Sequence, residues 1–249
     1  LLYGLQFKEV THLPKYHEDV RTYEVYDKNS DKFIGLFYAD FFPRETKRNG
    51  AWMSPIKEQG LHLSQIERPH IMIVCNFTKP TKTKPSLLTL NEVLTLYHEF
   101  GHALHGLLSN VKYKDLSGTN VYWDFVELPS QMMENWVLEK ECLDLFATHY
   151  ETGEKISEDL ISKIKESSKF LEGMATLRQL SFAFLDMNYH IKNPEDIESV
   201  EAFEKQSLEK TALLPSVEGT SISTSFSHIF AGGYSAGYYS YKWAEVLDA

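Results

Sequence analysis

The stretch Thr89–Ser109, TLNEVLTLYHEFGHALHGLLS, predicts one helix that lines a cleft. Thr89 followed three residues later by Glu92 forms a capping-box pattern, which marks a helix start. Mostly apolar residues recur at spacings of three and four, which predicts a buried face of the helix. These residues are Leu90, Val93, Leu94, Tyr97, Gly101, Leu104 and Leu108. The opposite stripe is polar and holds Asn91, Thr95, His98, His102, His105 and Ser109.

Within this helix, residues 98–102 read HEFGH and match the pattern H-E-x-x-H. Residues i and i+4 project from one side of a helix, so the imidazoles of His98 and His102 can bind one Zn²⁺ at about 2.0–2.1 Å. Glu99 is placed to accept a proton from a water on that metal, as a general base. The alternative is an ordinary helix with two histidines around a glutamate. The capping box and the polar stripe favour the zinc site.

The amino-acid composition limits the classes of protein to which this chain can belong. The 249 residues are 43% hydrophobic and 24% charged, which is ordinary for a globular protein. The net charge of −10 argues against nucleic acid as a partner, and no apolar run is long enough to span a membrane. Two cysteines make no disulfide framework and favour a reducing, cytoplasmic compartment. The chain begins without methionine and ends in a helical pattern, so we expect a piece of a longer protein.

The order of patterns predicts a mainly α fold in a single catalytic region, residues 1–249, with one small antiparallel β-sheet beside the helix of residues 89–109. The β part is expected in residues 20–88 and the helical part in residues 89–249. Arg21–Ala39 reads as a hairpin, Ala51–Ser54 as a short edge strand and His70–Phe77 as a buried strand.

Helical patterns dominate the second part of the chain. Residues 130–190 read as helical with a break near Thr152-Gly153, and residues 194–214 suggest a further helix. Small residues are then frequent from Gly219 to Gly237.

A catalytic zinc takes three protein ligands and keeps a position for water, so a third ligand is needed. The metzincin continuation requires glycine at position 105 and histidine at position 108, which here are His105 and Leu108. A glutamate from a later helix is the alternative. The candidates are Glu127, Glu134, Glu139 and Glu141, and their positions alone favour Glu127 only slightly.

The segment Phe226–Trp243, FSHIFAGGYSAGYYSYKW, is the second candidate for chemistry. Tyr234, Tyr238 and Tyr241 fall at i, i+4 and i+7, as on one face of a helix that opens after Gly232-Gly233. An aromatic stripe in the core is the simpler interpretation. However, buried hydroxyls need partners, and phenol or imidazole donors can stabilise the oxyanion of peptide hydrolysis.

Four segments together resemble the thimet oligopeptidase family of zinc peptidases, which includes oligopeptidase A and the bacterial peptidyl-dipeptidases. These segments are HEFGHALH (98–105), SGTN (117–120), DFVELPSQMMENW (124–136) and Phe226–Trp243. The resemblance implies a gluzincin-type site whose third ligand is Glu127, 25 residues after His102. Glu134 or Asp124 could then orient a ligating imidazole, and His105 is a neighbour of the site.

In that family the glycine-rich segment touches the substrate, which implies substrate contacts for Gly232, Gly233 and Tyr238. By position, the resemblance also implies catalytic roles for His228, Tyr234 and Tyr241. The family's proteins are much longer, with a large helical portion before the region that corresponds to this chain. The chain therefore resembles the catalytic half, and the missing helical half is an expected partner.

The sequence predicts a zinc metallopeptidase for short peptides, with one Zn²⁺ per chain. The SGTN and DFVE segments resemble the peptidyl-dipeptidases more than the oligopeptidase A branch, so release of C-terminal dipeptides is favoured over internal cleavage. A non-catalytic peptide-binding module is the alternative from another class. Glu99 argues against that module, because a site for binding alone has no use for a general base.

Overall fold

The computed structural model describes residues 2–249 and divides the chain into two compact units. The first contains the residues up to Tyr122 together with Leu128–Ile156, and the second contains Trp123–Glu127 and Ser157–Ala249. The helix of residues 89–109 and the strands before it belong to the first unit. Each unit has its own core, and each is described by itself.

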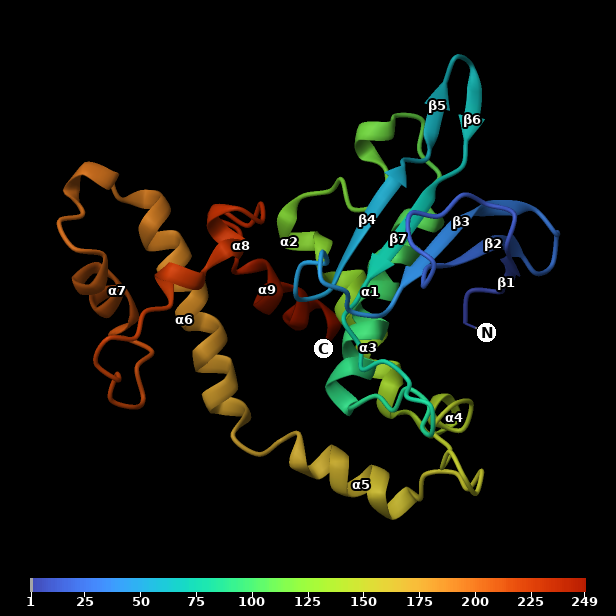
Figure 1. Cartoon of the computed structure of the whole chain (residues 1–249). Helices are drawn as coiled ribbons and strands as arrows, with labels where there is room; N and C mark the ends of the chain where they lie inside the picture. Colours follow the sequence, from blue (N-terminus) through green and yellow to red (C-terminus); the bar gives the residue numbers. More distant parts are fainter. Residues whose placement is uncertain (1) are drawn as a thin grey trace. The chain divides into compact units, whose positions relative to one another are not determined.

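The first unit is built on a five-stranded sheet with the order β1-β2-β3-β7-β4 (Figure 1). Its strands are β1 (Leu5–Val10), β2 (Arg21–Asp27), β3 (Phe33–Asp40), β7 (His70–Val74) and β4 (Trp52–Lys57). The predicted hairpin is confirmed, because β2 and β3 pair antiparallel with Arg21 opposite Ala39. The predicted edge strand is confirmed as well, since β4 pairs with β7 alone in this sheet.

The prediction of a wholly antiparallel sheet was wrong. β3 and β7 pair in parallel, with Leu36 opposite His70 and Asp40 opposite Val74. The chain between them is long enough to make a crossover, and it includes β4 and a separate hairpin of β5 (Gly60–His62) and β6 (Gln65–Glu67). Strand β1 was also missed, although Leu5-Gln6-Phe7-Lys8 alternate between apolar and polar side chains before Glu9 interrupts the pattern.

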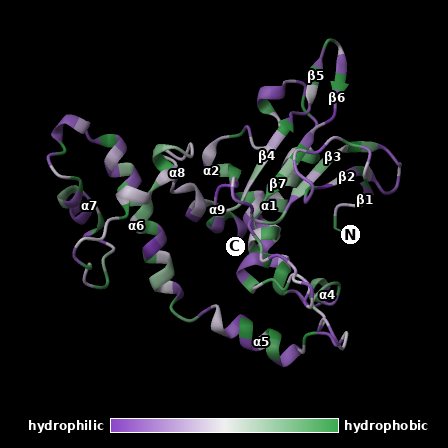
Figure 2. Ribbon diagram, viewed as in Figure 1, coloured by the Kyte–Doolittle hydropathy of each residue, from purple (hydrophilic) through white to green (hydrophobic). Residues whose placement is uncertain are grey.

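Helix α1 (Leu90–Leu107) begins as the sequence predicted. Thr89 is the N-cap, and its side chain and that of Glu92 form the reciprocal capping box. The helix lies on the sheet, where Ala103 and Leu107 join a core cluster with buried side chains of β2, β3 and β7. The central strands β3 and β7 are coloured as largely hydrophobic in Figure 2. The face of α1 on the sheet therefore consists of Leu96, Phe100, Ala103 and Leu107 and differs from the predicted face, of which Leu90 and Leu108 are exposed. The histidine stripe lies on the side of the helix away from the sheet.

Shorter helices complete the first unit. They are η1 (Lys114–Leu116), α3 (Leu128–Glu134), η2 (Asn135–Leu138) and α4 (Lys140–Leu143). Of these, α3 packs most extensively on α1. The predicted break near Thr152-Gly153 corresponds to a turn whose flanks form a β-bridge between Thr148 and Lys155.

The second unit is helical. Its elements are α2 (Trp123–Val126), α5 (Glu158–Ser167), α6 (Glu172–Ile191), η3 (Pro194–Asp196), α7 (Val200–Leu208), η4 (Ser223–Ser225), α8 (Ser227–Phe230) and α9 (Ser240–Asp248). Its core cluster consists of Leu185, Phe226 and Ile229, with Phe182 and Tyr238 packed against it. None of the helices formed by residues 2–249 is both long and apolar enough to cross a membrane.

The prediction of a helix that begins directly after Gly232-Gly233 was wrong in its extent. Gly233 and Ala236 have φ angles of 88° and 54°, which a right-handed helix does not allow, and α9 begins only at Ser240. Tyr234 therefore lies in irregular backbone and Tyr238 in a turn, while Tyr241 lies in α9. The three rings still meet, with centroids 5.0–6.5 Å apart.

Candidate metal centre and active site

Helix α1 supplies two imidazoles and one carboxylate to the candidate site. The rings of His98 and His102 lie one turn apart, with centroids separated by 4.9 Å and planes at 86°. Glu99 lies between them in sequence and is buried. Burial and the Glu99 carboxylate together raise the pKa of the Cys75 thiol, just after β7, to about 12.

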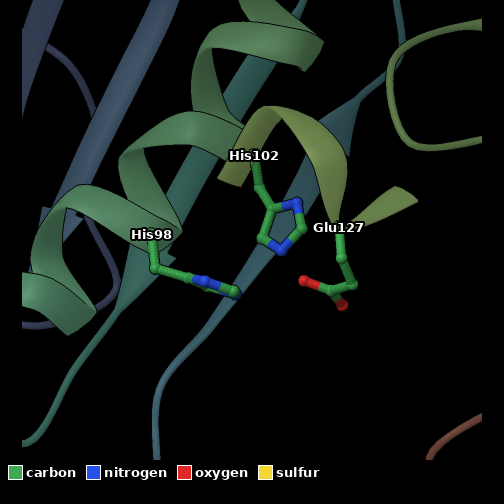
Figure 3. Close-up of side chains that lie close together, drawn as sticks. All are labelled: His98, His102 and Glu127. Carbon is green, nitrogen blue, oxygen red and sulfur yellow. The ribbon is translucent and has the colours of Figure 1, made fainter. Parts of the chain in front are cut away.

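Glu127 completes a group of three possible ligands. Ligand atoms of His98, His102 and Glu127 all lie within 4.8 Å of one another, and Figure 3 shows the three side chains converging. Glu127 follows α2 directly and is bonded to Leu128, the first residue of α3. Among the four glutamates that the sequence left open, Glu127 is the one in this group. His105 is outside it and lines a separate cavity of about 320 Å³ with Ser109 and Met133.

The donor set fits a zinc ion. Two imidazole nitrogens and one carboxylate oxygen are typical ligands of a catalytic zinc, which needs one further position for water. His98 Nδ1 lies 2.7 Å from Glu134 Oε1, so Nε2 is the nitrogen that would bind a metal. A carboxylate in this position fixes the ring orientation and the tautomer of a ligating histidine. Glu134, which the sequence offered as one of two candidates for this contact, is the residue that makes it.

We expect Glu134→Gln to lower zinc affinity about 10- to 100-fold, the usual effect of removing such an outer partner. The amide keeps the shape of the side chain but loses the charge that orients the His98 imidazole and raises its basicity. A competition titration with a chromogenic chelator measures the change. The matched control is Glu141→Gln on α4, where the carboxylate is exposed and should leave affinity unchanged. Equal affinities for the two variants would contradict the role of Glu134.

Gly101, within the H-E-x-x-H pattern, sets how closely α3 approaches α1. A Cβ built at Gly101 would lie 2.6 Å from Ser130 Cα and would also overlap the Pro129 carbonyl oxygen. Both obstacles are backbone, which cannot rotate away. The absence of a side chain at position 101 therefore lets the start of α3, and with it Glu127, lie close to the two histidines.

We expect Gly101→Ala to reduce the free energy of unfolding by about 1–3 kcal/mol, as overpacking usually does. It should also weaken zinc binding, because α3 must move and Glu127 is bonded to its first residue. Thermal unfolding with and without zinc measures both effects. Gly173→Ala in α6 is the control, since no atom beyond its chain neighbours and the backbone of its own helix lies within 4 Å of a Cβ there, and φ is not positive. A Gly101→Ala variant as stable as this control would contradict the packing argument.

The second unit holds the tyrosine segment. The Tyr234 hydroxyl donates a hydrogen bond to Glu127 Oε1, and the Tyr234 ring stacks on Tyr241 with centroids 5.2 Å apart and planes at 15°. Burial first, and then the Glu127 charge, raises the pKa of Tyr241 far above its ordinary value. Tyr241 therefore stays protonated at neutral pH. This unit thus brings two of the predicted catalytic tyrosines to the Glu127 carboxylate.

The other predicted residues of this segment have different surroundings. His228 is exposed, and its ring lies 6.0 Å from that of Tyr234 and 5.8 Å from that of Tyr238. Tyr238 packs on Phe226 in the core of the unit, and burial raises the pKa of its phenol. Gly232 and Gly233 are exposed. At Gly232 a Cβ would lie 2.9 Å from the His228 carbonyl oxygen, so the tight turn requires glycine there.

Trp123 and Asp186 were missed by sequence reasoning. The Trp123 ring lies 4.7 Å from the Tyr234 ring and packs over Gly233, next to the DFVE segment. Asp186 is fully buried and accepts hydrogen bonds from the backbone of the tyrosine segment. The available signal for Asp186 was a single acidic residue in the otherwise uncharged run LSFAFLDMNYH, because a carboxylate there must find buried donors.

Comparison with known proteins agrees with the residues found at the candidate site. Peptidase family M3 matches residues 1–249, and the chain belongs to that family. It is 42% identical over 255 residues to oligopeptidase A of Salmonella typhimurium and 41% identical over 250 residues to dipeptidyl carboxypeptidase of Escherichia coli. It is 38% identical over 253 residues to a thimet-like oligopeptidase of Dictyostelium discoideum. The resemblance to the thimet oligopeptidase family is confirmed.

These alignments cover 99–100% of the chain but only 36–37% of each relative's length. The activity and the substrates of a whole protein that contains this chain are therefore matters of proposal.

Proposed function

We propose that residues 1–249 form the catalytic region of a gluzincin-type, zinc-dependent metallopeptidase that hydrolyses short peptides. The observation that carries this proposal is the convergence of His98, His102 and Glu127 within 4.8 Å, with Glu99 on the same helix as the two histidines. Membership of peptidase family M3 supports it. The relatives' much greater length supports a further portion in the full-length protein, which the family resemblance implies to be helical.

Each residue then has a definite task. His98, His102 and Glu127 hold one Zn²⁺, which when bound acidifies water and polarises the substrate carbonyl. Glu99 accepts a proton from the attacking water, whose oxygen bonds to the carbonyl carbon. Glu99 then returns the proton to the amine nitrogen as the C–N bond breaks. Tyr241, with Tyr234 or His228, donates to the carbonyl oxygen while that oxygen carries negative charge.

Substrate binding is proposed at two places. The outer edge of β4 is not paired within this sheet, and an extended peptide can add to such an edge through backbone hydrogen bonds. Pro55 in β4 has no N–H group, which limits the hydrogen bonds to the residues around it. The second place is the glycine-rich turn, where Gly232 and Gly233 let the backbone approach a ligand. Tyr238 is proposed as a substrate contact at this second place because of the family resemblance.

We infer release of C-terminal dipeptides as the mode of cleavage, on the evidence of the SGTN and DFVE segments. Internal cleavage is the second candidate, since relatives named oligopeptidase A are as similar as those named dipeptidyl carboxypeptidase. Peptides that differ only in a free or an amidated C-terminus separate the two modes. A dipeptide-releasing enzyme needs the free carboxylate, whereas an internal cleaver accepts both. The unpaired cysteines and a relative named probable cytosolic oligopeptidase A support a cytoplasmic location.

The test of the proposed function uses the full-length protein, its metal content and a quenched fluorescent peptide. We expect one zinc per chain, loss of hydrolysis after treatment with a chelator and recovery on addition of zinc. Bound zinc without turnover would favour the non-catalytic peptide-binding module. A protein that hydrolyses the peptide equally well without metal would overturn the zinc mechanism.

A further inference from the structure

The segment that carries the tyrosines has little regular structure to hold its shape. Between Ser221 and Tyr239 it contains only one turn of 3-10 helix and the four residues of α8. Ala236 adopts φ of 54°, a left-handed conformation that costs free energy for any residue with a Cβ. The position of the Tyr234 and Tyr241 hydroxyls therefore depends on tertiary contacts that hold the backbone of this segment.

Asp186, on α6, makes the contact at the C-terminal end of the segment. Its side chain is fully buried, and its two oxygens are both used. Oδ1 accepts from the Ala236 N–H at 2.9 Å and also lies 2.9 Å from His190 Nδ1, while Oδ2 accepts from the Tyr238 N–H at 2.9 Å. One carboxylate thus fixes the left-handed residue and the turn between Tyr234 and Tyr241.

Glu204, on α7, makes the equivalent contact at the N-terminal end. This buried carboxylate accepts from the backbone N–H groups of Ile222 and Ser223 at 2.9 and 2.8 Å, and from the hydroxyls of Ser221 and Ser223. Burial acts to raise the pKa of Glu204, but these hydrogen bonds outweigh it and leave that pKa below its ordinary value. Glu204 is therefore an ionised acceptor at neutral pH.

We infer that Asp186 and Glu204 are positioning residues for the proposed reaction: two buried carboxylates clamp the ends of residues 221–238 and hold Tyr234 and Tyr241 in place. The inference rests on the proposed function for its catalytic consequence. The clamps themselves consist of hydrogen bonds within one compact unit. Carboxylate acceptors suit this task, because each can satisfy several N–H groups that burial would otherwise leave without water.

The first test is Asp186→Asn in the full-length protein. The amide has the same shape, but its NH₂ group would face a backbone N–H in place of an acceptor, so one of the two contacts is lost. We expect kcat to fall about 10- to 100-fold, as for a catalytic group displaced by about 1 Å, while KM changes less than about threefold. Zinc content should be unchanged. Glu172→Gln, an exposed carboxylate on the same helix, is the control and should keep wild-type kcat.

Two further measurements separate positioning from general destabilisation. In a Tyr241→Phe background the effect of Asp186→Asn on kcat should shrink to a few-fold, because the group it positions is already absent. Equal fold-losses in both backgrounds, or a full kcat for Asp186→Asn, would overturn the inference. If Asp186→Asn does not fold, Glu204→Gln repeats the test at the other clamp. Its control is Glu201→Gln, an exposed carboxylate on α7.

A readout that needs no activity keeps this inference distinct from the proposed function. Hydrogen exchange at the Ala236 and Tyr238 amides should be slow in the wild type and at least tenfold faster in Asp186→Asn, since exchange requires the clamp to open. Fast exchange in the wild type would show that no clamp exists, whatever the enzyme does. Slow exchange in a protein without peptidase activity would retain the clamp and reject the proposed function alone.

Discussion

Glu99→Gln in the full-length protein is expected to bind zinc as the wild type does and to lose about 10²- to 10⁴-fold in kcat, the usual contribution of a general base. Glutamine has nearly the volume of glutamate, so the packing of this buried position against its neighbours should be preserved. The amide cannot accept the proton of the attacking water or return it to the leaving amine. Metal analysis and single-turnover hydrolysis of one peptide measure the two quantities separately.

The matched control is Glu92→Gln on the same helix. Glu92 belongs to the capping box and is half-buried, so its amide should weaken that box, reduce stability slightly and leave kcat at the wild-type value. Turnover of Glu99→Gln within a few-fold of the wild type would remove Glu99 as the base. Loss of zinc from Glu99→Gln would also fail the prediction, since it would give Glu99 a structural role.

Local patterns predicted the parts of this fold that local physics determines. The start of α1 follows from Thr89 and Glu92, which satisfy each other's backbone donors whatever the rest of the chain does. The approach of His98 and His102 follows from the helical repeat alone. Glu127 is different, because four glutamates fitted the residue types and only the family resemblance separated them.

Long-range features were missed because no local signal specifies them. The parallel pairing of β3 with β7 is decided by the crossover between them and not by the residues of either strand. The tyrosine spacing of four and three fitted a helix, yet Gly233 and Ala236 adopt positive φ and interrupt it. Asp186 explains why Ala236 can do so, and its partners lie 50 and 52 residues away in sequence.

Tyr241→Phe is expected to lower kcat about 10²- to 10³-fold, comparable to the loss of one oxyanion-hole donor. Tyr241 is the leading candidate for this role by the family resemblance, and the neighbouring Tyr234 hydroxyl donates to Glu127. The raised pKa of Tyr241 keeps its own phenol protonated through the neutral range. Removing the hydroxyl leaves the ring free to stack on Tyr234, so the fold and the zinc content should be preserved.

The division of the Tyr241→Phe effect between kcat and KM decides what Tyr241 does. A donor that acts only on the developing oxyanion stabilises the transition state and not the bound substrate, so kcat and kcat/KM should fall together while KM stays nearly constant. Exposed Tyr239→Phe, two residues earlier, is the control and should behave as the wild type. A rise in KM with kcat unchanged would make Tyr241 a substrate contact, and the oxyanion donor would then be sought at His228, which is exposed on the same segment.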